Sequence, residues 1–172
     1  MKRLIFVIPV FLILFAFCSQ GPSPDEVKKW IEVVDIKTQW VQKYGPQVRP
    51  WEVVYVPSIR FKLKNNGTKP VRILYFNAEF KFKDEEKSLG YDYKAFPQKE
   101  PIKPGEVSKE VFLRCPYGFR ASSKESFIHN PYWKKAEVKI FAGIPGGRLV
   151  NLGVFPIENK LEDEEQSGQE QK

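Results

Sequence analysis

The stretch 58–83 constrains the fold more than any other part of this chain. Apolar and basic residues alternate over 59–64, and apolar and polar residues alternate again over 74–82. A period of two is typical of a strand with one buried and one solvated face. The turn sequence between the two runs, 65–68, contains Asn-Gly, which tolerates the positive φ angles of a tight turn. The pattern therefore predicts a β-hairpin at the centre of a β-sheet protein.

Six further segments have the composition or periodicity of strands. In segment 28–44 the apolar residues fall at both odd and even positions. Its β-branched residues favour a long first strand, not a helix, and a bulge in that strand would explain the mixed pattern. Segment 51–56 is either a short strand or an extended lead-in that Pro57 separates from the hairpin. Further strands are predicted at 88–96, 106–115, 135–142 and 148–155.

Two of the connecting segments have recognisable signals of their own. Segment 97–105 contains three prolines and is predicted to be a loop, because proline interrupts strand pairing. Segment 122–129 is predicted to form a short helix with Ser122 or Ser123 as its N-cap, ended by Asn130-Pro131. About seven strands separated by such signals predict an all-β, immunoglobulin-like antiparallel β-sandwich over 28–157.

A resemblance agrees with this fold. The sequence Lys64-Asn65-Asn66-Gly67-Thr68-Lys69-Pro70-Val71 precedes a Phe-rich strand, and Lys103-Pro104-Gly105-Glu106 precedes a later one. These motifs resemble the small extracytoplasmic immunoglobulin-like domains of bacteria, including the FxLYD type. The resemblance covers 31–155. It implies a domain outside the cytoplasm that is not an enzyme.

The N-terminal segment 1–17 has the features of a secretory signal peptide. Two basic residues precede an apolar stretch, 4–17, which is shorter than the roughly 20 residues of a membrane-spanning helix. Polar and turn-forming residues begin immediately after Cys18 and predict a tether over 18–27.

The sequence Leu14-Phe15-Ala16-Phe17-Cys18, leading into this tether, resembles the lipobox of bacterial lipoproteins. Phe15 and Phe17 stand where that family usually has Leu and a small residue. The resemblance implies that Cys18 carries lipid, such as palmitate, and that Ser19 after it favours the outer membrane, facing the periplasm. Cleavage by the ordinary signal peptidase near 16–19 and an uncleaved anchor are the alternatives.

The charge of the chain is unevenly distributed. The formal net charge is +7, yet segment 158–172 holds six acidic and two basic side chains and is predicted to be a disordered tail. Basic residues at alternate strand positions favour solvated faces that resist edge-to-edge pairing. The alternative is attraction to an anionic lipid, polymer or protein.

Few residues offer catalytic chemistry. Cys115 could act as a nucleophile with His129, the only histidine, as its base. Cys115 ends an apolar strand, however, and is expected to be a buried structural thiol. Neither cysteine has the spacing of metal ligands, and Asp84-Glu85-Glu86 is expected to be a solvated turn, not a cation site. We therefore expect no catalytic residues, no cofactor and no metal.

The sequence alone leaves two alternatives undecided, one for the cysteines and one for the tryptophans. A disulfide between Cys18 and Cys115 is conceivable if Cys18 is retained without lipid. Trp40, Trp51 and Trp133 lie near predicted strand ends and are expected to pack in the core or at its rim. An exposed aromatic shelf that stacks on sugars is the alternative.

The sequence as a whole predicts a lipid-anchored lipoprotein of the bacterial cell envelope that acts as a binding or scaffolding module. Its partners would be the membrane, through the anchor, and another envelope protein or an anionic polymer. Nucleic acid is not expected, because the protein is exported. A secreted or periplasmic binding domain for an anionic polymer without a lipid anchor, and an enzyme using Cys115 and His129, are the alternatives.

Overall fold

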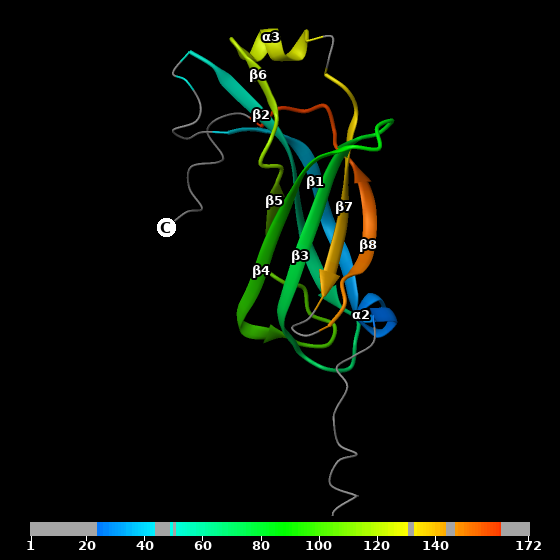
Figure 1. Cartoon of the computed structure of the whole chain (residues 1–172). Helices are drawn as coiled ribbons and strands as arrows, with labels where there is room; N and C mark the ends of the chain where they lie inside the picture. The colour runs from blue at the N-terminus through cyan, green and yellow to red at the C-terminus, as the bar shows by residue number, and fades with distance from the viewer. Residues whose placement is uncertain (1–23, 44–48, 50, 131–132, 144–146, 163–172) are drawn as a thin grey trace, which may run out of the picture.

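The computed structural model describes residues 24–43, 49, 51–130, 133–143 and 147–162. These residues form mainly β-strands, with two short helices (Figure 1). In chain order the elements are α2 (Pro24–Trp30), β1 (Ile31–Gln42), β2 (Val53–Asn65), β3 (Val71–Phe82), β4 (Ser88–Ile102), β5 (Val111–Arg114), β6 (Phe119–Ala121), α3 (Lys124–Ile128), β7 (Ala136–Gly143) and β8 (Val150–Pro156).

Two antiparallel sheets pack against each other. One has the order β1-β2-β5, with β6 also pairing with β2, and the other has the order β4-β3-β7-β8. The first, second and fifth strands thus oppose the third, the fourth and the last two, which is the division of an immunoglobulin-like sandwich. The predicted fold class is confirmed. The described part has eight strands instead of about seven, because the short β6 was not predicted.

The core lies between the two sheets, where strand residues of one parity meet. The rings of Phe61 in β2 and Phe76 in β3 make an edge-to-face contact with centroids 5.5 Å apart. The largest fully buried side chains are Trp40, Phe61, Phe76, Phe80, Phe127, Ile59, Leu63, Leu74, Leu113, Ile140, Val27 and Val56. The alternation over 59–64 and 74–82 therefore identified the buried faces of β2 and β3 correctly.

The predicted hairpin between these two strands is wrong. β2 and β3 belong to different sheets, so the connection 66–70 crosses from one sheet to the other. The buried side chain of Asn65 shapes this connection. Its Nδ2 donates to the carbonyl oxygens of Lys69 at 2.9 Å and Ile102 at 2.8 Å. Its Oδ1 accepts from the N–H of Gly67 at 2.9 Å, forming a side-chain turn in place of a two-residue hairpin loop.

β1 contains the bulge that the mixed pattern of 28–44 predicts. Its pairing with β2 shifts register between Val34 and Lys37, and Asp35 has a φ angle of 53°. Odd-numbered residues such as Ile31 face the core before the shift, and even-numbered residues such as Trp40 do so after it. The extra residue of the bulge explains the change of parity.

Residues 53–56 are extended as predicted, but β2 continues through Pro57, so the predicted separation of this segment from the next strand is wrong. The carbonyl oxygen of Pro57 accepts from the N–H of Cys115 at 2.9 Å, and its nitrogen points to the same side. On that side Pro57 falls between the residues of β2 that pair with β5 and those that pair with β6. A residue without an N–H removes no ladder hydrogen bond there.

Two other strand boundaries also differ from the prediction. β4 extends to Ile102, through most of the segment 97–105 that we predict to be a loop. β4 lies at the edge of its sheet, where proline is tolerated because one side of the strand needs no donor. β5 covers only Val111–Arg114 of the predicted strand 106–115.

The short helix predicted near 122–129 is confirmed as α3. Ser123 is its N-cap, and its Oγ accepts from the N–H of Ser126 at 3.1 Å. The N–H of Ser123 in turn donates to the Oγ of Ser126 at 3.0 Å, which completes a capping box. Phe127 is the buried residue that attaches the helix to the core.

The folded part begins and ends beyond the predicted boundaries. α2 starts at Pro24, and its Val27 is only 2% exposed, so the predicted tether 18–27 extends too far. Leu161 forms a parallel β-bridge with Trp40, so the predicted tail 158–172 starts too early.

Several predictions fall outside the described residues. These are the signal peptide 1–17, the lipidated Cys18, and most of the acidic tail, 163–172. In the described part, no helix has both the length and the apolar character that crossing a bilayer requires.

Candidate functional site

The structure places Cys115 and His129 in different surroundings. The Cys115 side chain is 1% exposed, close to Gly90, and burial raises the pKa of its thiol from an ordinary 9.0 to about 11. His129 is exposed at the C-cap of α3, where its Nδ1 lies 2.8 Å from the carbonyl oxygen of Glu125. Cys115 is thus the buried free thiol that the sequence predicts, and no described contact joins the two residues.

The acidic turn 84–86 pairs with a lysine. Glu85 forms an ion pair with Lys134. Among the described residues no group of three or more His, Cys, Asp or Glu side chains lies close enough together to hold a metal ion.

The tryptophans do not form a shared exposed shelf. Trp40 is fully buried, and its ring lies 6.1 Å from that of Trp133, which packs against the core. Phe119 and Phe127 join the same aromatic cluster. Trp51 alone of the three is exposed, at 68%. Core and rim packing is therefore the observed outcome for Trp40 and Trp133.

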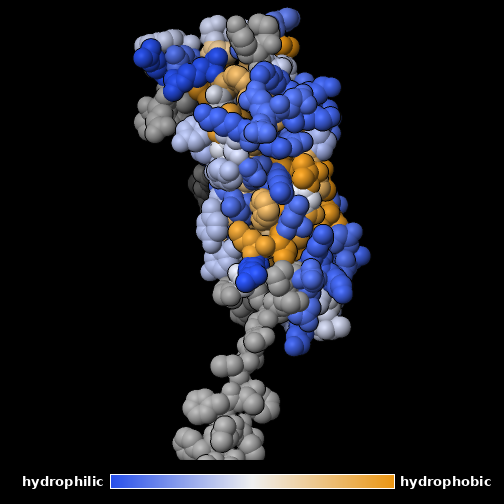
Figure 2. Space-filling view, turned by 45° about the vertical axis from the view of Figure 1, so that its right-hand side comes forward, coloured by the Kyte–Doolittle hydropathy of each residue, from blue (hydrophilic) through white to orange (hydrophobic). Residues whose placement is uncertain are grey.

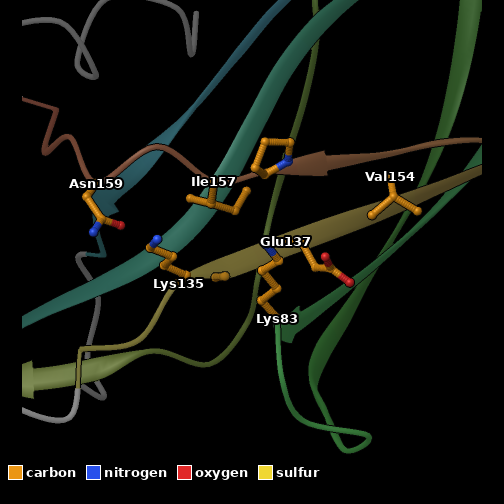
Figure 3. Close-up of a pocket in the computed structure, with 8 residues that line it drawn as sticks. Lys83, Lys135, Glu137, Val154, Ile157 and Asn159 are labelled. Atoms are coloured by element: carbon orange, nitrogen blue, oxygen red, sulfur yellow. The ribbon is translucent and has the colours of Figure 1, made fainter.

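A groove of about 520 Å³ lies where β3, β7 and β8 meet the segment after β8 (Figure 3). Its lining combines apolar and charged groups: Lys83, Lys135, Ala136, Glu137, Val154, Pro156, Ile157 and Asn159. In Figure 3, Lys135 and Asn159 lie toward one end of the groove and Val154 toward the other.

Backbone hydrogen bonds hold the walls of the groove in place. The N–H of Lys83, just after β3, donates to the carbonyl oxygen of Lys135 at 2.9 Å. The N–H of Ile157, just after β8, donates to the carbonyl oxygen of Ala136 at 2.8 Å. The lysines and the apolar floor are therefore brought together by the register of β3, β7 and β8, of which β3 is distant in sequence from the other two.

The rim of the groove is positively charged. The one acidic residue in its lining, Glu137, forms an ion pair with Lys81 at 3.2 Å. Lys83 and Lys135 form no ion pair with any residue that the structure describes, and both are exposed. A carboxylate or phosphate entering the groove would meet two free ammonium groups beside an apolar surface.

A second depression of about 360 Å³ lies at the other end of the sandwich. It is lined by Lys28, Lys29, Ile31, Glu32, Val33, Asn66, Leu152 and Phe155. Here Glu32 already accepts from Nδ2 of Asn66 at 2.8 Å. Figure 2 shows that hydrophobic side chains gather in the middle of the surface it depicts, with hydrophilic side chains above and to the right.

Comparisons with known proteins found similar chains among solved structures. No family model and no curated protein sequence matches the chain. A structural genomics target is 12% identical, with a TM-score of 0.45 over 77% of this chain and 89% of its own. A protein from Archaeoglobus fulgidus is 16% identical, with a TM-score of 0.38 over 73% of this chain and 92% of its own.

Sequence reasoning did not identify the groove. Lys83, Lys135 and Asn159 each follow or precede a strand, and no local motif connects them. The available signal was the position of these basic and polar residues at strand ends. Using it would have required the pairing of β3 with β7, which the sequence did not predict.

Proposed function

We propose that the protein is a membrane-anchored, non-enzymatic binding module of the bacterial envelope that holds an acidic segment of a partner protein in the groove. One observation carries the proposal: the groove and the segment nearest to Cys18 lie at opposite ends of the sandwich. An anchor at Cys18 would leave the groove facing away from the membrane.

The two ends are defined by the strands themselves. α2 lies beside the connection 66–70, since the N–H of Asn66 donates to the carbonyl oxygen of Trp30 at 2.7 Å. β3 runs from this end to the groove, and β7 returns from it (Figure 1). At about 3.3 Å per residue, the eight residues of β7 alone place the groove roughly 25 Å from the α2 end.

The length of chain between Cys18 and α2 supports the same orientation. Pro24, the first residue of α2, follows Cys18 by six residues. Six residues span at most about 20 Å when fully extended. A lipid on Cys18 therefore keeps the α2 end close to the bilayer, and several acyl chains make the attachment stable where one is marginal.

The chemistry of the groove favours an acidic peptide as its ligand. Two free ammonium groups, on Lys83 and Lys135, attract carboxylates, while Val154 and Ile157 offer apolar contact. A peptide that carries acidic and apolar side chains satisfies both parts of the site. A purely polyanionic glycan or lipid headgroup would leave the apolar floor uncovered.

The anchor is tested by intact-mass spectrometry of the protein extracted from bacterial membranes. The expected mass is that of a chain beginning at Cys18 plus lipid, and the Cys18→Ser variant is expected to lose it. A chain without lipid would overturn the anchored form and favour a secreted or periplasmic binding domain.

The groove is tested by fluorescence anisotropy with a labelled peptide of alternating glutamate and valine. The variant Lys83→Gln/Lys135→Gln should bind about 5- to 10-fold more weakly, because each exposed charge pair contributes roughly 0.2–1 kcal/mol. The matched control is Lys69→Gln/Lys109→Gln, which removes the same charge from two exposed positions toward the α2 end, where Ser108 beside Lys109 bonds to Leu63. Equal weakening in both variants would indicate general attraction and contradict a specific site.

A further inference from the structure

We propose that the acidic C-terminal segment 163–172 occupies the same groove, between Lys83 and Lys135, and competes with the external acidic ligand. This inference rests on the proposed function, because it takes the groove to be the ligand site. It assigns a role to the acidic segment, which the binding function itself does not use.

The described chain leads directly from the groove to this segment. Asn159 lines the groove, and the next residues attach to the edge of β1. The N–H of Trp40 donates to the carbonyl oxygen of Lys160 at 2.8 Å, and the N–H of Glu162 donates to the carbonyl oxygen of Trp40 at 2.9 Å. These bonds fix the point from which segment 163–172 departs.

The departure point lies close to the groove. Asp163 follows Asn159 by four residues, so the two are at most about 14 Å apart. The ten residues 163–172 can extend a further 33 Å or so, which is ample for a return to Lys83 and Lys135. The ring of Trp40 also lies 6.1 Å from that of Trp133, two residues before Lys135.

The charges of the segment and the groove are complementary. Segment 163–172 carries four acidic side chains, Asp163, Glu164, Glu165 and Glu170, against one lysine. Other basic residues already hold carboxylates: Lys81 pairs with Glu137 and Lys134 with Glu85, and on the other sheet Arg60 pairs with Glu110 and Glu162. Lys83 and Lys135 accept a new carboxylate without breaking any of these ion pairs.

Tethering makes even a weak contact effective. A segment attached through a short linker acts at an effective concentration in the millimolar range. An external acidic peptide must compete with that concentration, so the segment should raise the apparent Kd for the peptide severalfold. Added salt should reduce this effect, because it screens exposed charges beyond about 10 Å at 0.1 M.

The proposed position of segment 163–172 in the groove is tested by zero-length carbodiimide cross-linking of the full chain in detergent, followed by peptide mapping. We expect amide cross-links from Asp163, Glu164 or Glu165 to Lys83 or Lys135, and none to Lys69 at the α2 end. Cross-links mainly to Lys62 or Lys64 on the outer face of β2, or none to the groove lysines, would overturn the inference.

Competition between segment 163–172 and an external acidic peptide is tested by measuring peptide binding to the full chain and to a chain that ends at Glu162. The shortened chain should bind the glutamate–valine peptide at least threefold more tightly at low salt. The difference should disappear in Lys83→Gln/Lys135→Gln. Equal binding by both lengths would overturn the competing segment and leave the groove intact, whereas no binding by the shortened chain would overturn the proposed function.

Discussion

Asn65 shows how one side chain can determine a connection between sheets. It is fully buried and joins three backbone groups, in the connection 66–70 and at Ile102. Its own N–H and carbonyl oxygen bond to Glu106 and Gly105. The residue therefore holds the β2–β3 and β4–β5 connections together at the α2 end of the molecule.

We predict that Asn65→Ala lowers the free energy of unfolding by at least about 3 kcal/mol. The substitution leaves two carbonyl oxygens and one N–H without their partner, and each buried polar group left unpaired costs roughly 1–3 kcal/mol. Urea unfolding measures the change. Asn66→Ala is the matched control, because the Asn66 side chain is exposed and its one described hydrogen bond is to Glu32, while its backbone bond to Trp30 is kept in the variant. This substitution should cost under about 0.5 kcal/mol. Similar losses in both variants would contradict the role assigned to Asn65.

Cys115 gives a prediction about pH. Its pKa is raised to about 11 in the folded protein by burial, while the unfolded thiol titrates near 9.0. Between these values the unfolded state has lost a proton that the folded state still holds. The thiol's contribution to stability is therefore complete below pH 9 and declines as the pH rises toward 11.

The measurement compares the free energy of unfolding of the natural chain and Cys115→Ala from pH 8 to pH 11. The natural chain should lose stability more steeply above pH 9 than the variant does. Parallel curves would show that burial of the thiol does not shift its titration. Alkylation of the native protein should also be slow until it unfolds, because the thiolate is the reactive form.

At the scale of elements, the bulge in β1 decides which side chains reach the core. Asp35 adopts a φ of 53°, a left-handed conformation that Asp tolerates better than a β-branched residue. We predict that Asp35→Val lowers the free energy of unfolding by about 1–2 kcal/mol. Asp35→Gly should change it by less than about 0.5 kcal/mol. Chemical unfolding of both variants provides the comparison.

The glycine variant is the internal control for that experiment. Both substitutions remove the exposed ion pair between Asp35 and Lys62, so this loss cancels between them. The remaining difference reports the backbone conformation. If valine and glycine proved equally stable at this position, the strained bulge would not be a feature of the protein in solution.

Strands could be predicted from the sequence where apolar and polar residues alternate regularly. Which strands pair with each other could not be predicted. The parity of β3 and β7 identified their buried faces, and the irregular parity of β1 indicated its bulge. Alternation is a local property, however, and it does not determine which strand lies alongside. Asn65-Asn66-Gly67 reads as a hairpin turn until the bonds of Asn65 to Lys69 and Ile102 are known.

β4 shows a second reason why the arrangement of the strands could not be predicted from the sequence. Two of its charged side chains reach toward β5 at the open side of the sandwich. Asp92 accepts from the N–H of Arg114 at 3.0 Å, and Lys94 donates to the carbonyl oxygen of Phe112 at 3.4 Å. These side chains satisfy the unpaired edge of β5. They also interrupt the apolar pattern by which a buried strand is recognised.

At the scale of the whole molecule, the site could not be predicted because it exists only in the assembled sandwich. Lys83 and Lys135 are 52 positions apart and meet through the pairing of β3 with β7. Asn159 joins them because the chain after β8 crosses toward β1. The sequence did indicate the excess of basic residues and the acidic end of the chain, which are the charges that the proposals above bring together.

The arrangement of the two ends of the sandwich determines how an anchored protein would be oriented on a membrane. Lys69 lies in the connection beside α2, and Glu125 lies on α3 beyond the groove, and both side chains are exposed. The 12 residues of β3 separate the two ends by roughly 40 Å. If Cys18 is anchored, a probe at position 69 should lie much closer to the lipid headgroups than a probe at position 125.

We predict that a fluorophore attached to Lys69→Cys transfers energy to acceptor-labelled headgroups in vesicles more efficiently than one attached to Glu125→Cys. Cys115 should not compete for the label, because it is buried and its pKa is about 11. Adding Cys18→Ser to either variant should abolish transfer, since the domain then leaves the vesicle. Equal or higher transfer from position 125 would mean that the groove faces the bilayer, and an acidic protein segment would no longer be its expected ligand.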